Sequence, residues 1–216
     1  MDVHALRLEI LEPLIGSSIK QIANQIHWKH PGAKYTHYRL HQDMRFRERA
    51  DLFEDLSNSY FTTGLAIKKI DAGNGGLKVF PGSHKLGYLG LSDKHDYIMQ
   101  GQNADSDTEA DADLLAAGLD PKEAVVCELE PVDLVIWGLL MVHGSGANTS
   151  DRNRPLILNS YVRASSSSQR GEWAFREGVS TPLGTEQNIC RFEDFDEHPE
   201  PFYNETDWTG DQPKLT

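Results

Sequence analysis

The sequence has few cysteines, no long apolar run and no basic leader, and each shortage excludes a class of protein. The two cysteines, Cys127 and Cys190, lie far apart and outside any Cys-x-x-Cys pair, so we expect neither a disulfide framework nor a zinc motif. The longest apolar run, residues 134–142, is too short for a bilayer span of about 20 residues. Because the N-terminus also has no signal-peptide pattern, we expect a cytoplasmic protein in a reducing compartment.

Basic residues are also in short supply. There are 21 lysines and arginines against 33 aspartates and glutamates, which gives a formal net charge of −12. A charge of this sign argues against nucleic acid or an anionic membrane as partner, and it favours a small-molecule substrate. The 216 residues are enough for one domain with a sizeable core, and the composition is that of a globular protein. The sequence leaves the oligomeric state open.

Short apolar or alternating segments, separated by turn signals, fill the middle of the chain. Strands are predicted at residues 35–46, 60–70, 77–80, 124–129, 134–143 and 156–162. Many short strands with little helix between them predict a mainly β protein with an antiparallel barrel or sandwich. Before them, residues 4–26 have apolar positions at helical spacing, interrupted by Pro13 and Gly16. They predict a cover of two short helices.

Two acidic regions lie outside this pattern. Residues 101–120 are rich in aspartate and predict a solvated helix or loop, with a lid over a site as the alternative. After the serine run 165–168, the tail combines 11 acidic residues with several aromatic ones. We therefore predict a domain at 1–164 and an extension at 165–216 that packs on the barrel.

The stretch 41–43 reads His-Gln-Asp. On an extended strand, side chains two residues apart share a face, so His41 and Asp43 would present an imidazole and a carboxylate together. These groups are two-thirds of the ligand set of non-haem Fe(II) oxygenases. The alternative is a surface histidine beside an acid. A second His-x-carboxylate step, at 198–200, contains a proline that argues against a strand.

A third ligand and an anchor for a co-substrate follow later in the chain. His143 ends the most apolar predicted strand, where the alternative reading is a core histidine bonded to a backbone carbonyl. Arg154 begins the next strand, and an arginine can bind a carboxylate through two hydrogen bonds. A surface role for this arginine is the alternative, and Arg152 is a competing candidate. The order of the four residues fits an iron site with a 2-oxo acid as co-substrate.

The chain resembles the phytanoyl-CoA dioxygenase family of Fe(II)/2-oxoglutarate-dependent oxygenases over about residues 5–164. The resemblance is carried by HQD at 41–43, NGGLKVFPGSHKLG at 74–87, HGSGANTSDRNRPLILNSY at 143–161, WKHPG at 28–32 and VDLVIW at 132–137. It implies a double-stranded β-helix, which is a jelly-roll or cupin-like barrel, with a few flanking helices. One departure is the short region before His41, where the family usually has more helix.

The resemblance also implies roles for individual residues. His41, Asp43 and His143 would bind Fe(II), while Arg154 and Ser145 would bind the far carboxylate of 2-oxoglutarate. The implied activity is an oxygenase of the EC 1.14.11 type, which uses O2 and releases succinate and CO2. No catalytic residue beyond the iron ligands is implied.

The substrate is less well defined by the sequence. Met44, Arg45 and Arg47 follow the first ligands and are candidates for the pocket mouth, with a solvated strand end as the alternative. We expect hydroxylation of a small carboxylate, amino-acid-like or natural-product substrate. Three alternatives stay open: a catalytically silent metal-binding barrel, a cupin-like metal enzyme that does not use 2-oxoglutarate, and a nucleic-acid demethylase. The net charge argues against the last of these.

Overall fold

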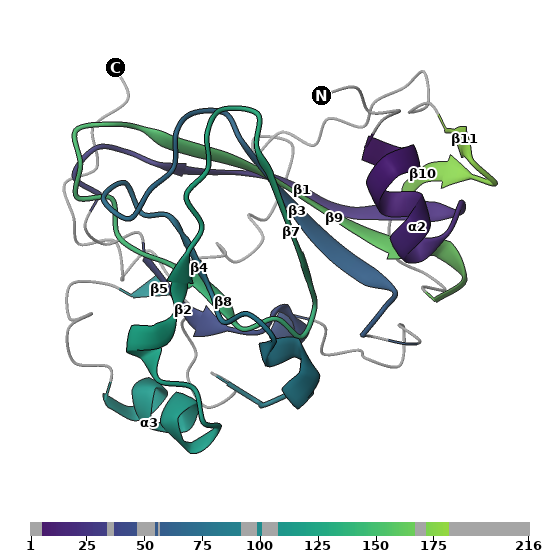
Figure 1. The fold of residues 1–216 in the computed structure, drawn as a ribbon. Helices are drawn as coiled ribbons and strands as arrows, with labels where there is room; N and C mark the ends of the chain where they lie inside the picture. The colour runs from purple at the N-terminus through teal and green to yellow at the C-terminus, as the bar shows by residue number, and fades with distance from the viewer. Residues whose placement is uncertain are drawn as a thin grey trace, which may run out of the picture. The chain divides into compact units, whose positions relative to one another are not determined.

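The computed structural model describes residues 6–33, 37–46, 55, 57–91, 99–100, 108–166 and 172–181. The chain divides into two compact units at residue 181, and all the described residues belong to the first unit. Two antiparallel sheets form the framework of this unit (Figure 1).

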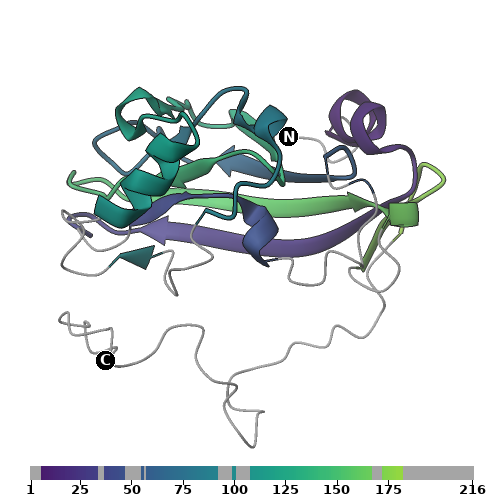
Figure 2. The same cartoon turned by 90° about the horizontal axis from the view of Figure 1, so that it is seen from below.

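The larger sheet has six strands in the order β11-β10-β1-β9-β3-β7. Its strands are β1 (Ile19–Lys29), β3 (Tyr60–Ala66), β7 (Leu134–Gly138), β9 (Arg154–Arg163), β10 (Glu172–Arg176) and β11 (Val179–Ser180). The two longest, β1 and β9, lie side by side as the purple and green strands of Figure 2. Their register ends with Lys29 opposite Arg154. Two cationic side chains are therefore neighbours at one end of this sheet.

The smaller sheet has five strands in the order β5-β2-β8-β4-β6. They are β2 (His37–His41), β4 (Leu77–Val79), β5 (Met99–Gln100), β6 (Val125–Val126) and β8 (His143–Ser145). Along the chain, β1, β3, β7 and β9 belong to the larger sheet, while β2, β4 and β8 return to the smaller one. This passage between two antiparallel sheets is the double-stranded β-helix, so the predicted fold class is confirmed.

Short helical segments flank both sheets. They are η1 (Leu6–Leu11), α2 (Glu12–Ile15), η2 (Asp43–Phe46), η4 (Ser83–Leu86), α3 (Thr108–Ala116), η6 (Pro121–Glu123) and η7 (Ala164–Ser166). Leu11 and Ile15 pack on the larger sheet, against a cluster formed by Ile19, Tyr161 and Phe175. Leu114 of α3 packs beside the smaller sheet, against Phe80, Leu91 and Val142. Each sheet therefore has a helical segment buried against it.

One of the two predicted N-terminal helices is wrong. Residues 6–15 are helical, but Ile19–Lys29 is the long strand β1. Its register with β9 shifts between Gln21 and Ala23, which marks an irregularity in the pairing. Such a shift interrupts the two-residue alternation of a strand, and the apolar positions then imitate helical spacing.

Several predicted strands extend beyond the observed ones, and two of these include the candidate metal ligands. The apolar run 134–143 is divided between β7 in the larger sheet and β8 in the smaller sheet, and residues 139–142 form the corner that joins them. Leu139 and Val142 in this corner are fully buried. A buried corner is as apolar as a buried strand, so composition could not separate the two. The strand predicted at 35–46 ends at His41, and Asp43 begins the helical turn η2.

Several predictions concern regions that are described only in part. The acidic segment includes α3, while residues 101–107 lie outside the described residues. In the tail, β10 pairs with β1, so the larger sheet continues beyond residue 164. Residues 182–216 are outside the described part, and the predicted boundary at 164 stays a prediction. Within the described ranges, no helix has the length and apolar character needed to cross a membrane.

Candidate metal centre

Three potential metal ligands converge between β2, η2 and β8. His41 ends β2 and His143 begins β8, and the pairing of these strands places the two residues opposite each other. Asp43 follows two residues after His41. Its Oδ1 lies 3.7 Å from His41 Nε2 and 3.5 Å from His143 Nε2. All three ligand atoms lie within 4.8 Å of one another, so this group could hold one metal ion.

Backbone carbonyls fix the orientation of both imidazoles. His41 Nδ1 donates to the carbonyl oxygen of Arg39 at 2.7 Å, and His143 Nδ1 donates to that of Met141 at 2.9 Å. A carbonyl oxygen can only accept, so the proton of each neutral ring is on Nδ1. In a neutral ring Nε2 then carries no proton, and both Nε2 atoms lie near Asp43 Oδ1. This is the tautomer that a histidine ligand needs when it binds a metal through Nε2.

The larger sheet holds the carboxylate of Asp43. Thr62 Oγ1 donates to Asp43 Oδ2 at 3.3 Å, and Trp137 Nε1 donates to the same atom at 3.2 Å. Thr62 and Trp137 are themselves opposite each other in the pairing of β3 with β7. With Oδ2 held by two donors, Oδ1 is the oxygen that faces the histidines. Such outer hydrogen bonds orient a metal ligand and tune its affinity.

The charges of the three groups are strongly coupled. Burial acts to raise the pKa of Asp43, but the charge of His143 and the hydrogen bonds of both imidazoles outweigh it and hold that pKa well below its ordinary value. Burial acts to lower the pKa of His143, and the Asp43 carboxylate reverses this and raises it. Burial and the neighbouring His143 lower the pKa of His41. The Asp43 carboxylate therefore favours the charged form of His143, and a metal cation would compete with a proton at this site.

A second buried cluster carries positive charge. Arg154 is 2% exposed, and its Nε and Nη2 donate to the carbonyl oxygen of Gly75 at 3.1 and 2.9 Å. Burial lowers the pKa of Arg154 to about 10. Ser145 lies two residues after His143 on β8, and its Oγ accepts a hydrogen bond from Lys29 Nζ at 2.7 Å. Among the residues that the structure describes, no carboxylate pairs with Arg154 or Lys29.

Residues 8–156 match the family model described as phytanoyl-CoA dioxygenase. The chain belongs to the phytanoyl-CoA dioxygenase family. It is 30% identical over 156 residues to the peroxisomal phytanoyl-CoA dioxygenase of Bos taurus, a match that covers 69% of this chain and 41% of that protein. The match therefore spans less than half the length of this relative.

Solved structures share the fold of this family member. The non-heme monooxygenase ThoJ in its apo form superimposes with a TM-score of 0.54 and 18% identity, over 74% of this chain and 53% of that one. EvdO2 from Micromonospora carbonacea var. aurantiaca, complexed with 2-oxoglutarate, gives a TM-score of 0.52 and 16% identity, over 77% and 59% of the two chains. At these identities the likeness shows the fold alone.

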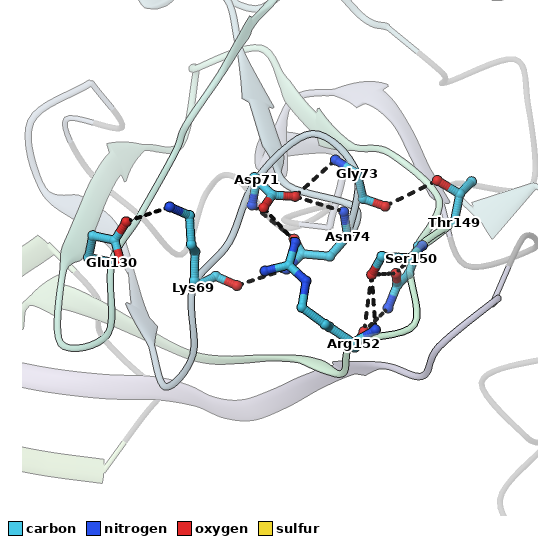
Figure 3. A network of polar contacts seen from close by, with 9 residues as sticks. Lys69, Asp71, Gly73, Asn74, Glu130, Thr149, Ser150 and Arg152 are labelled. Atoms are coloured by element: carbon cyan, nitrogen blue, oxygen red, sulfur yellow. Dashed lines mark hydrogen bonds and ion pairs between the residues drawn. The ribbon is translucent and has the colours of Figure 1, made fainter.

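In this phytanoyl-CoA dioxygenase family member, a network of polar contacts joins the loop at residues 69–74 to the loop at residues 149–152 (Figure 3). Asp71 forms an ion pair with Arg152 at 2.6 Å and accepts hydrogen bonds from the backbone of Gly73 and Asn74. The hydrogen bond from Arg152 is the main cause that lowers the pKa of Asp71. Asn148 is fully buried and ties the carbonyl of Lys29 to this loop at 3.0 Å. The network fixes the backbone on which Arg154 and Lys29 rest.

Gly75 shows how tightly the cluster is packed. Its φ is +83°, and a Cβ there would lie 2.6 Å from the carbonyl oxygen of Gly146 and 3.0 Å from Lys29 Cδ. No side chain fits that gap. The carbonyl of Gly75 therefore approaches Arg154 closely only because the residue is glycine.

Of the three predicted substrate residues, only Met44 has a side chain that the structure describes. Met44 packs beside the cluster formed by Tyr60, Leu139 and Val162, and its N–H donates to the carbonyl of Leu139. The side chain of Arg45 and the whole of Arg47 lie outside the described residues.

A cavity of about 200 Å³ lies beside Trp137, lined also by Phe61, His84, Ile136, Leu140 and Met141, and none of the three potential ligands lines it.

Sequence reasoning missed four residues that support the site. Lys29, Thr62 and Trp137 carry no motif of their own, although each lies on a predicted or quoted segment. The fourth is Gln42, which is fully buried between His41 and Asp43. Its side-chain amide donates to the carbonyls of Gly87 and Leu140 and accepts from the N–H of Leu89. The sequence did contain a signal for Gln42. It is an uncharged amide between two candidate ligands, and an amide is more easily buried than a charged group.

Proposed function

We propose that this protein is an Fe(II)- and 2-oxoglutarate-dependent oxygenase that hydroxylates a small molecule. The observation that carries the proposal is the buried convergence of His41, Asp43 and His143 beside a second buried site that is cationic. Two imidazole nitrogens and one carboxylate oxygen are the ligand set of non-haem Fe(II) centres. Membership of the phytanoyl-CoA dioxygenase family supports the same chemistry.

The roles of the three ligands follow from their surroundings. His41 and His143 would bind iron through Nε2, because Nδ1 of each ring is used by a backbone carbonyl. Asp43 would bind through Oδ1, because Thr62 and Trp137 hold Oδ2. When bound, iron supplies the oxidation chemistry, in which O2 and 2-oxoglutarate are consumed and succinate and CO2 are released. The protein's own part is to hold the ligands in one geometry and to exclude water from them.

Arg154 and Ser145 would bind the far carboxylate of 2-oxoglutarate. Arg154 donates to the backbone carbonyls of Gly75 and His27, and within the described ranges no acidic side chain pairs with it. A buried guanidinium without a counter-ion is unfavourable, and an anionic ligand would relieve this. Ser145 supplies a hydroxyl from the same strand as His143. This arrangement supports a co-substrate that reaches from the metal to the cationic cluster.

The chemistry at the metal and the protein's charge limit the substrate. Asp43 occupies the ligand position that a halogenase would leave free for chloride, so we favour hydroxylation. The net charge of −12 disfavours a bulky polyanion such as a CoA thioester. We propose a small carboxylate, an amino-acid-like molecule or a natural product as substrate. Met44, Arg45 and Arg47 remain our candidates for its binding.

The test is an anaerobic titration of the purified protein with Fe(II) and then 2-oxoglutarate, followed by visible absorption. A charge-transfer band is expected in the parent and absent in His143→Ala. Arg154→Ala should need about 10- to 100-fold more 2-oxoglutarate, because a hydrogen-bonded charge is lost. The exposed His30→Ala and the exposed Arg176→Ala on β10 serve as matched controls and should retain the band. A folded, iron-loaded parent that gives no band would overturn the proposal.

A further inference from the structure

The proposed iron chemistry does not use the cavity beside Trp137. This cavity has a volume of about 200 Å³, and none of the three potential metal ligands lines it. Most of its lining is apolar and consists of Phe61, Ile136, Trp137, Leu140 and Met141. Two further lining residues, Ser57 and His84, are polar and exposed. The cavity therefore combines apolar walls with polar groups on the side that faces solvent.

A glycine helps to keep this cavity open. Gly138 is the last residue of β7, and it is not among the glycines with positive φ. A Cβ at this position would lie 3.8 Å from Phe61 Cε1 and 4.0 Å from the carbonyl oxygen of Ser57, which are ordinary contact distances. Phe61 and Ser57 both line the cavity. A side chain at position 138 would therefore occupy space that the glycine leaves free.

Two residues of the cavity wall also hold potential metal ligands. Trp137 Nε1 donates a hydrogen bond to Asp43 Oδ2 at 3.2 Å. The carbonyl oxygen of Met141 accepts a hydrogen bond from His143 Nδ1 at 2.9 Å. The wall therefore contacts two of the three ligands directly, on the side of each ligand that faces away from the metal.

A third wall residue contacts the segment between two of the ligands. The carbonyl oxygen of Leu140 accepts a hydrogen bond from the side-chain amide of the buried Gln42 at 2.7 Å. Trp137 is also closely packed, since its ring centre lies 5.2 Å from that of His143. A Cβ at Gly64 would lie only 3.2 Å from Trp137 Cζ3. A shift of the cavity wall would therefore move groups that touch the metal centre.

We propose that this cavity binds a small neutral molecule with one apolar ring, and that this molecule and the metal each strengthen the binding of the other. An apolar cavity of about 150 Å³ can hold benzene, so this one has room for a ring with a small substituent. A polar substituent would face Ser57 and His84. The described residues that line the cavity include no carboxylate, lysine or arginine, which favours a neutral ligand. The inference goes beyond the proposed function, because that function leaves the cavity unused.

The linkage follows from the shared wall. A molecule in the cavity would support Trp137 and Met141 from the side opposite the ligands. Their hydrogen bonds to Asp43 and His143 would then be kept in the geometry that the metal requires. Two ligands that favour the same arrangement raise each other's affinity by the same factor. The competing account is a packing gap that binds nothing and has no influence on the metal.

The first experiment follows the indole N–H signals of the isotope-labelled, metal-free protein by nuclear magnetic resonance while benzyl alcohol is added. The signal of Trp137, assigned with Trp137→Phe, should shift and saturate, whereas that of the exposed Trp28 should not. Glucose is the control probe, because it has a ring of similar size but is polar, and it should cause no saturating shift.

A variant with a filled cavity shows whether the probe binds there. Gly138→Leu should weaken the binding of benzyl alcohol at least about tenfold, because its side chain takes the same space. The exposed Val179→Leu on β11 is the matched control and should bind the probe like the parent. Gly138→Ala adds only a methyl group and should weaken binding less. Thermal unfolding is recorded for each variant, and Gly138→Ala decides in the same way if Gly138→Leu does not fold.

Two results of this experiment would overturn the inference. The first is a parent whose Trp137 signal shows no saturating shift with benzyl alcohol. The second is an equal shift in the parent and in the filled variant, which would place the probe elsewhere.

The second experiment measures the linkage by equilibrium dialysis of Fe(II) under nitrogen, with and without saturating benzyl alcohol. The parent and Val179→Leu should bind iron about fivefold more tightly with the probe, and Gly138→Leu should not respond to it. Bound benzyl alcohol with an unchanged iron affinity would overturn the linkage. A parent that binds no Fe(II) would overturn the linkage together with the proposed function, whereas binding of the probe to the cavity is decided by the first experiment alone.

Discussion

The two sheets contribute different kinds of group to the site. The smaller sheet and the turn after it provide His41, Asp43 and His143, the residues that would touch a metal. The larger sheet provides groups that hold others, such as Thr62 and Trp137 on the carboxylate. It also provides the cations Lys29 and Arg154 at the end of its two longest strands. Short paired strands place the ligands, and the long strands fix their orientation and charge.

The metal centre and the cationic cluster also differ in how their charges are balanced. At the metal centre a carboxylate lies between two imidazoles, so opposite charges are balanced within the protein. In the cationic cluster, no carboxylate in the described part of the chain balances Lys29 or Arg154. The charges at the metal centre would therefore favour a cation, and those of the cationic cluster would favour an anion. A ligand that chelates a metal and ends in a carboxylate would satisfy both.

The largest effect on iron binding is expected from replacing Asp43, the potential metal ligand that follows β2 of the smaller sheet. Asp43→Asn keeps the shape but removes the charge, and its one oxygen would accept from Thr62 and Trp137, which leaves an amide NH2 toward the metal. Iron affinity should fall at least about 100-fold, because a direct ligand is lost rather than a supporting group. Equilibrium dialysis with Fe(II) under nitrogen measures this. The exposed Asp151→Asn is the control, and an unchanged affinity in Asp43→Asn would remove Asp43 from the metal site.

Next in size is the effect of closing the gap at Gly75. Gly75→Ala should lower the free energy of unfolding by roughly 3 to 5 kcal/mol, because φ is positive and the new Cβ meets the Gly146 carbonyl. Gly82→Ala is a matched control, with φ at +86° and nothing within 4 Å of its Cβ, and should lose about 1 kcal/mol. Urea unfolding compares them. Equal losses would mean that close approach at Gly75 is unimportant.

A smaller effect is expected from removing the hydrogen bond that Trp137 of the larger sheet donates to Asp43. Trp137→Phe removes the indole donor and keeps an aromatic ring, so iron should bind about tenfold more weakly. Trp28→Phe is the counterpart, because the exposed Trp28 also donates an indole hydrogen bond, to Asn153 at 2.9 Å. It should leave iron affinity unchanged. If Trp137→Phe binds iron as tightly as the parent, the hydrogen bond from Trp137 to Asp43 Oδ2 does not contribute to iron affinity.

The smallest effect is a pH dependence of stability without metal. The pKa of His143 is raised in the folded protein, so its contribution to stability is fully present below its ordinary pKa of 6.5 and is lost as pH rises through the raised value. His143→Ala should therefore destabilise the chelator-treated protein more at pH 6 than at pH 9, by on the order of 1 kcal/mol. Denaturant unfolding at both pH values measures the difference, with His30→Ala as control. The opposite sign would contradict a raised pKa for His143.

How much the sequence could predict differs between these regions. His41, Asp43, His143 and Arg154 were singled out because together they fit one ligand pattern and lie in segments that resemble a known family, and the structure brings the first three together. The position of Lys29 opposite Arg154 was not predicted, since it depends on a register with β9 that joins residues more than a hundred positions apart. The strand Ile19–Lys29 was read as helix because the register shift near Gln21 disturbs its alternation. The corner at 139–142 was read as strand because it is buried.

The central claim is that one ligand connects the metal centre to the cationic cluster. The most direct test is an anaerobic crystal structure with Mn(II) in place of iron and with 2-oxoglutarate, read from the anomalous signal of the metal. The account predicts manganese about 2.0 to 2.3 Å from Nε2 of His41 and His143 and from Asp43 Oδ1. It also predicts the far carboxylate between Arg154 and Ser145. Manganese bound elsewhere, or a co-substrate whose far carboxylate contacts neither Arg154 nor Ser145, would contradict it.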